Sequence, residues 1–329
     1  MKPGNIFTRL LTIFGTGLIL LFFSEYFFFN EGPADKMTRV VAGGKKTLLL
    51  GYIELSLFYS LFSVWLLFPI FYFKIRSFWA LYLVAGFFGI ATEGIVIPLI
   101  YTESLIWPAL SWHVLVDVLF GWFLVRFLLT KNNPFYTVPL AVSIGLAWAF
   151  WAPWTHVGDD PLIPEPAQFT GFVLFTSLGV FVGYFILNLV RKNEFNPTGL
   201  ELGFFGFLTL ALWIPMLIGA WLPMIETKPV NSFLLPIYLG VSIYTLHRHG
   251  RSETRENLFA VLRTKIAWWN LLLMAFLPIT AIIAYPFFYR HELFPPTGLV
   301  VLTMKTSAIL LTPLAVLMLW RDIIKHTKS

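Results

Sequence analysis

The sequence predicts an all-α polytopic integral membrane bundle of about ten transmembrane helices, and three observations favour this fold class. Of the 329 residues, 58% are hydrophobic and only 12% are charged, whereas a soluble domain carries about 25% charged residues. Ten apolar runs are candidates for helices that cross the roughly 30 Å hydrocarbon core of a bilayer. Lys and Arg are concentrated in alternate loops between these runs, so that most of them fall on one side of the membrane, as the positive-inside rule requires. These observations exclude a soluble globular protein and a disordered chain.

The predicted spans begin and end at charged, Pro, Gly or Asn residues that interrupt the apolar runs. The eighth span is the shortest of the ten. The first follows Lys2 and Arg9 as a signal peptide would, but it ends in the aromatic run Tyr26–Phe29 without a small-residue cleavage site, so it is predicted to stay in the membrane. We expect the chain, 1–329, to form a single transmembrane domain. In order, the spans cover residues 8–29, 47–73, 77–101, 107–129, 135–153, 168–190, 198–222, 231–246, 265–289 and 297–320.

The basic residues predict the orientation of the bundle. Sixteen of the 23 Lys and Arg residues fall on the side that holds both ends of the chain, six fall on the other side, and Lys305 lies within a span. Both termini are therefore predicted to be cytoplasmic. Short loops and the absence of cysteine favour the cytoplasmic membrane of a prokaryote, with membrane lipid as the surrounding partner.

Composition also excludes several kinds of chemistry. The chain has no cysteine, which excludes disulfides, thiolate catalysis and cysteine-based metal sites. The net charge of +6 is explained by cytoplasmic loops, and no basic stripe with interleaved aromatic residues is present, so nucleic acid is not a predicted partner. The sequence contains no HExxH, P-loop or GxGxxG motif.

Five ionisable residues fall inside the predicted spans at similar depths in the outer half of the bilayer. At about 1.5 Å per residue, Glu54 and His113 lie about 10 and 9 Å below the outer ends of their spans. Glu93 and Lys305 lie about 12 Å down, and Asp117 lies about 15 Å down. Ionisable groups in hydrocarbon are costly unless they are paired or hydrated. We therefore expect them to converge on one cavity that opens outward, with Glu25 nearer the outer end of the first span.

Two local patterns mark part of this layer as a candidate site. His113 and Asp117 are four residues apart and share a helix face, so the carboxylate can accept a hydrogen bond from the imidazole and fix its tautomer. Pro98 follows Glu93 closely and is expected to kink the third span beside it. The alternatives without function are a local helix pair for His113 and Asp117, and a salt bridge from Lys305 to a neighbouring acid.

Three chemistries fit these residue types. Glu93, His113, Asp117 and the later His156 are candidate ligands for a divalent metal such as zinc. Without a metal, Glu93 can act as a general base on water while His113 or His156 polarises a carbonyl. The same carboxylates can instead load and release protons during transport. For His156, which lies beside Trp151 and Trp154, the alternative is an ordinary residue of the interfacial aromatic belt.

Three stretches resemble the CAAX-protease and bacteriocin-processing (Abi) intramembrane endopeptidases. The family's glutamate motif is similar to Thr92-Glu93-Gly94 and the residues up to Tyr101. Its aromatic motif, which ends in His, is similar to Trp151-Ala-Pro-Trp-Thr-His156. Its His-xxx-Asn/Asp motif is similar to residues 104–117. The resemblance implies that Glu93 is the base and that His156 belongs to the oxyanion or water-binding site. The sequence departs from the family in having one Glu where the family has two, in lacking its Arg, and in the order of the last two motifs.

The working hypothesis is an intramembrane hydrolase-like enzyme that acts on a lipid or a membrane-bound substrate. Glu93 is the predicted base, His113 with Asp117 the oriented imidazole, and His156 an auxiliary group at the mouth of the site. Glu54 and Lys305 are predicted substrate-binding groups. The alternatives are a proton-coupled secondary transporter that uses Glu54, Glu93 and Lys305 as a relay, and a non-catalytic membrane scaffold.

Overall fold

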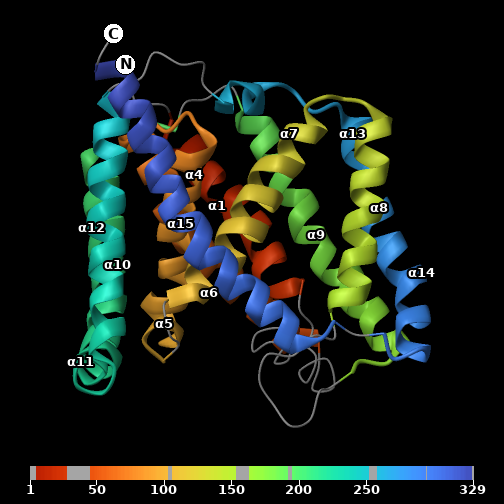
Figure 1. Ribbon diagram of the computed structural model, residues 1–329. Coiled ribbons are helices and arrows are strands. Elements are labelled where there is room, and N and C mark those ends of the chain that lie inside the picture. Colours follow the sequence, from red (N-terminus) through yellow and green to blue (C-terminus); the bar gives the residue numbers. More distant parts are fainter. Residues whose placement is uncertain are drawn as a thin grey trace.

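The computed structural model describes residues 5–27, 45–102, 106–152, 163–191, 195–251, 258–293 and 295–327, and in these ranges the only regular secondary structure is helical (Figure 1). Segments η1, η2, η4 and η5 are π-helical, and η6 is a 3-10 helix. In chain order the elements are α1 (Ile6–Leu21), η1 (Phe22–Tyr26), α3 (Lys45–Tyr72), α4 (Phe78–Ala91), η2 (Thr92–Val96), α5 (Leu99–Thr102), α6 (Trp107–Leu110), η4 (His113–Val125), α7 (Arg126–Leu129), α8 (Pro134–Trp151), α9 (Pro166–Val190), α10 (Gly199–Met216), η5 (Leu217–Trp221), α11 (Leu222–Thr227), α12 (Pro229–Arg251), η6 (Leu258–Arg263), α13 (Trp268–Leu273), α14 (Phe276–Arg290) and α15 (Thr297–Thr327).

The predicted class, an all-α polytopic membrane bundle, is confirmed. Within the described ranges, nine helical segments are long and apolar enough to cross a membrane. They match nine of the ten predicted spans. Large apolar side chains also cover much of the outer surface, for example Phe135 and Leu200, each 85% exposed, and lipid is the solvent that suits such a surface.

The eighth predicted span, 231–246, corresponds to α12, which is not among these nine segments. Its last five residues, 247–251, include two His and two Arg, which lowers its mean hydropathy. The helix nevertheless has 23 residues, or about 34 Å at 1.5 Å per residue, and it packs against α4 and α15. The start of α1 and the end of α15 lie at the same end of the bundle (Figure 1), as an even number of crossings requires.

Local sequence explains where several helices begin. The side chain of Asn5 accepts a hydrogen bond from the backbone of Phe7 at the start of α1, and Asn133 does the same for α8, which opens with Pro134. Thr198 and Glu201 form a capping box at the start of α10. These side chains satisfy backbone N–H groups that have no partner inside the helix.

Three segments form the centre of the bundle. Among the candidate spans the most enclosed is α4–η2, followed by α1–η1 and the continuous α6–η4–α7 segment. Close approach between them depends on glycine, since a Cβ on Gly89 would meet the carbonyl oxygen of Ala109 at 2.0 Å and one on Gly121 would meet the ring of Phe23 at 2.2 Å. Small residues at helix contacts are the usual way for membrane helices to pack closely.

Each of the three central segments is π-helical where it lies near the same end of the bundle. η1 continues α1, η2 continues α4, and η4 begins at His113. In a π-helix the backbone bonds run from residue i to i+5, and such segments are rare and often occur at functional sites. The three π-helical segments meet where the candidate site lies.

Candidate functional site

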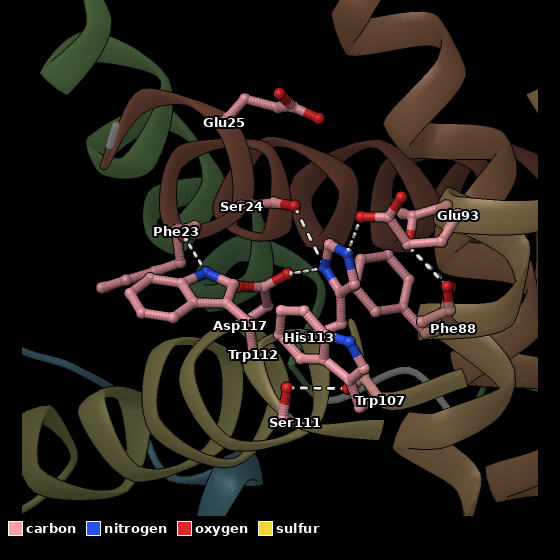
Figure 2. A network of polar contacts seen from close by, with 12 residues as sticks. Phe23, Ser24, Glu25, Phe88, Glu93, Trp107, Ser111, Trp112, His113 and Asp117 are labelled. Carbon is pink, nitrogen blue, oxygen red and sulfur yellow. Dashed lines mark hydrogen bonds and ion pairs between the residues drawn. The ribbon is translucent and has the colours of Figure 1, made fainter. Parts of the chain in front are cut away.

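The centre of the site is the imidazole of His113, which contacts a carboxylate at each ring nitrogen (Figure 2). Its Nε2 lies 2.6 Å from Oε1 of Glu93, and its Nδ1 lies 2.7 Å from Oδ2 of Asp117. These are short, charge-assisted distances. Each contact requires a hydrogen between nitrogen and oxygen, so the ring either donates at both nitrogens or accepts a proton from one acid.

The sequence prediction that Glu93, His113 and Asp117 lie together agrees with this geometry. His113 and Asp117 are one turn apart on η4, whereas Glu93 comes from η2, a different crossing. The side chains differ in accessibility, because Glu93 is 16% exposed, His113 is 7% exposed and Asp117 is fully buried. The site is therefore reached from the Glu93 side, and Asp117 forms its closed end.

The cluster extends to two further spans through groups that the sequence analysis did not assign to the site. Oγ of Ser24 lies 3.2 Å from Nδ1 of His113. The hydroxyl of Tyr59, on α3, lies 2.6 Å from Oγ of Ser24 and 2.5 Å from Oε1 of Glu25. A continuous set of hydrogen-bonding groups thus runs from Glu25 through Tyr59, Ser24 and His113 to Glu93.

A signal for Glu25 was present in the sequence, since an acid at the end of an apolar span needs a partner. No comparable signal existed for Tyr59 or Ser24. Tyrosine and serine are common in membrane helices, and only the rotation of α3 and α1 about their axes turns these two hydroxyls toward the site.

The surrounding packing holds the cluster in place. The ring of Phe88 meets the ring of His113 edge to face, with centroids 5.8 Å apart. The indole of Trp112 donates to the backbone carbonyl of Phe23, 3.2 Å away, which ties the start of η4 to η1 (Figure 2). Gly89 and Ala109 are in close contact one turn before Glu93 and His113, respectively. This contact sets the spacing between the two helices that carry the acid and the imidazole.

A divalent metal does not fit this arrangement of donors. Both nitrogens of His113 are already bonded to carboxylates, so neither presents a free lone pair to a metal. In the part of the chain that the structure describes, no group of three or more His, Asp or Glu side chains is arranged to hold a metal ion. Among the fully buried side-chain atoms of the cluster, Oδ1 of Asp117 has no hydrogen-bond partner, and a single oxygen does not make a metal site.

Two other predicted site residues, Glu54 and Lys305, do not join the cluster. Glu54 is exposed on α3, where its neighbours Ile53 and Leu57 are also exposed. Lys305, on α15, places its ammonium 5.2 Å from the ring centroid of Trp107, and no carboxylate among the described residues forms a salt bridge with it. His156 lies outside the described residues.

Fold and site together define an α-helical, polytopic membrane protein with a buried cluster of titratable groups near one end of the bundle. Comparison with known proteins found no matching family model, no similar curated protein and no similar solved structure. The assignment of a function therefore depends on the geometry of the cluster.

Proposed function

We propose that the protein is an intramembrane hydrolase in which Glu93 and His113 perform general acid–base catalysis on a lipid or a membrane-bound substrate. The observation that carries the proposal is the direct contact of a partly exposed Glu93 with an imidazole whose other nitrogen is held by the buried Asp117. A positioned base and an oriented imidazole within hydrogen-bond reach are the parts that such a reaction needs. The enzyme would reside in the cytoplasmic membrane of a prokaryote.

The reaction follows from the positions of these groups. Glu93 accepts a proton from a water molecule, and the water oxygen forms a bond to the carbonyl carbon of the substrate. The bond from that carbon to the leaving group then breaks, and the proton passes to the leaving group. Asp117 keeps the ring of His113 oriented. Once Glu93 has taken up the proton from water, it binds Nε2–H of His113 less strongly, and this N–H can then stabilise the oxyanion. His156 is proposed as an auxiliary group at the mouth, in keeping with the resemblance to the CAAX-protease and Abi endopeptidases.

The distribution of titratable groups favours an enzyme over a proton-coupled transporter. On α1–η1 the next ionised residue inward from Glu25 is Arg9, which is paired with Glu201 on α10. The two lie 16 positions apart in sequence (25 − 9), or about 24 Å, and none of the side chains between them is titratable. A transmembrane proton path along this helix would therefore lack carriers. The hydrogen-bonded groups that connect Glu25 to Glu93 instead run from one helix to its neighbours.

Labelling with ¹⁸O from water tests the proposal without knowledge of the substrate. Hydrolysis places one solvent oxygen in a product, so native membranes that contain the protein are incubated in H₂¹⁸O and their lipids and peptides are analysed by mass spectrometry. Glu93→Gln removes the base and should abolish the labelled product, with a loss of at least about 100-fold. Glu226→Gln is the matched control, because this exposed acid on α11 lies outside the cluster.

Two outcomes would overturn the proposal. One is a labelled product that forms equally well in wild type and Glu93→Gln. The other is the lack of any product specific to the wild type, combined with proton uptake into pyranine-loaded proteoliposomes that Glu93→Gln abolishes. The second outcome would establish the transport alternative, and inactivity in both assays would favour the scaffold.

A further inference from the structure

A groove on the outer surface of the bundle lies between α12 and α15, and its lining includes no residue of the hydrogen-bonded cluster. Its volume is about 530 Å³, within the range of sites that hold small molecules. Residues of α12 and α15 form its walls, and Ile106 and Leu110, at and beside α6, form its floor. Its rim is open to the surroundings, since Ile237 is 56% exposed and Leu317 is 66% exposed. A molecule dissolved in the bilayer can enter it from the side.

The lining of the groove is almost entirely apolar. Its three polar residues are Tyr238, Ser242 and Thr312. The hydroxyl of Tyr238 donates to the backbone carbonyl of Leu83, and Oγ1 of Thr312 lies 3.3 Å from the hydroxyl of Tyr82. Two of the three hydroxyls therefore already have partners in the protein. Such a lining suits a hydrocarbon chain.

A positive charge lies at one end of the groove. Lys305 is one helical turn before Ala308 and Ile309, which line it, and residues three or four apart share a helix face. The ammonium of Lys305 lies over the ring of Trp107, which directly follows Ile106 of the floor. No salt bridge to Lys305 occurs among the residues with described positions. An intramembrane cation of this kind needs an anionic partner.

We propose that this groove binds one acyl chain of an anionic phospholipid whose phosphate group pairs with Lys305. Along α15 the cation of Lys305 comes first and the apolar groove follows, from Ile309 through Pro313 to Leu317. A phospholipid has the matching order, with its phosphate group first and its acyl chain after it. The flexible stem of a lysine lets its ammonium reach toward the lipid headgroups while the methylenes stay in hydrocarbon. Trp107 supports the cation with its ring face. This proposal is independent of hydrolysis at Glu93.

Native mass spectrometry of the full-length protein tests the site. The protein is released from nanodiscs that contain equal amounts of phosphatidylglycerol and phosphatidylcholine, and the lipids that stay bound are identified. Wild type should retain phosphatidylglycerol preferentially. Lys305→Gln should reduce that preference about fivefold, the effect of one basic residue on binding an anionic lipid. Lys325→Gln, an exposed lysine near the cytoplasmic end of the same helix, should leave it unchanged.

A second variant tests the groove itself. Val241→Phe adds volume at a rim position that is 42% exposed, where a larger side chain can be accommodated without disturbing the core. This variant keeps Lys305 but should retain less bound lipid than the wild type, because the larger side chain narrows the groove. The proposal is wrong if Lys305→Gln keeps the wild-type preference, if Lys325→Gln loses it to the same extent, or if Val241→Phe retains as much lipid as wild type.

Discussion

Substitution of Gly89 by alanine tests whether close packing of α4 against α6 holds Glu93 and His113 together. A Cβ at this position would meet the carbonyl oxygen of Ala109 at 2.0 Å, whereas ordinary contact begins at 3.4 Å. The helices must therefore separate by up to 1.4 Å (3.4 − 2.0). Glu93 and His113 each lie four residues beyond this contact, on the same helix faces. Their 2.6 Å hydrogen bond would lengthen toward 4.0 Å (2.6 + 1.4), beyond hydrogen-bond range.

A double-mutant cycle measures this effect as a free energy of unfolding. In wild type, Glu93→Ala should cost about 1.5–3 kcal/mol, the contribution of a hydrogen bond to a charged group. In the Gly89→Ala background the same change should cost close to nothing, because the bond is already broken. Stability is read from titration with SDS in mixed micelles. Gly206→Ala on α10 is the control, since a Cβ there meets nothing within 4 Å. An equal cost of Glu93→Ala in both backgrounds would refute the reasoning.

Two further predictions concern the cluster and the orientation of the chain. Tyr59→Phe removes the hydroxyl that joins Ser24 to Glu25 and should cost about 1–3 kcal/mol of stability. The control is Tyr72→Phe, because Tyr72 is 68% exposed on the same helix, and this change should hardly shift the midpoint of unfolding in SDS. Equal midpoints for the two variants would contradict the described network. Because the chain has no cysteine, single cysteines in place of Lys228 and Lys325 report orientation directly. A membrane-impermeant maleimide should label Lys228→Cys in intact cells and Lys325→Cys only after permeabilisation, and the reverse pattern would invert the predicted topology.

The polar residues could be identified from sequence because each one is costly in hydrocarbon. Glu93, His113 and Asp117 are conspicuous in apolar runs, and residue spacing alone placed them at similar depths. The contact between His113 and Asp117 could be predicted because four residues separate them on one helix. Their contact with Glu93 could be predicted because buried ionisable groups tend to pair with one another.

The same reasoning could not distinguish Glu54 from Glu25. Both are acids in membrane helices, yet Glu25 belongs to the cluster and Glu54 is exposed on α3. In a soluble protein, hydrophobic periodicity marks the inward face of a helix, but a membrane helix is apolar on every side. The rotation of α3 about its axis is therefore decided by contacts such as that of Gly17 with Ser60, not by its own pattern of residues.

The sequence by itself determined the class of this protein, nearly all of its membrane spans and the three residues at the centre of its site, because length and charge in hydrocarbon obey strict limits. Only the tertiary structure decided that three π-helical segments carry the cluster, that Tyr59 and Ser24 connect it to Glu25, and that Lys305 lies instead beside a separate groove. These features depend on the depth and rotation at which one helix packs against another. That packing follows from the shapes of side chains distant in sequence, such as Gly89 and Ala109.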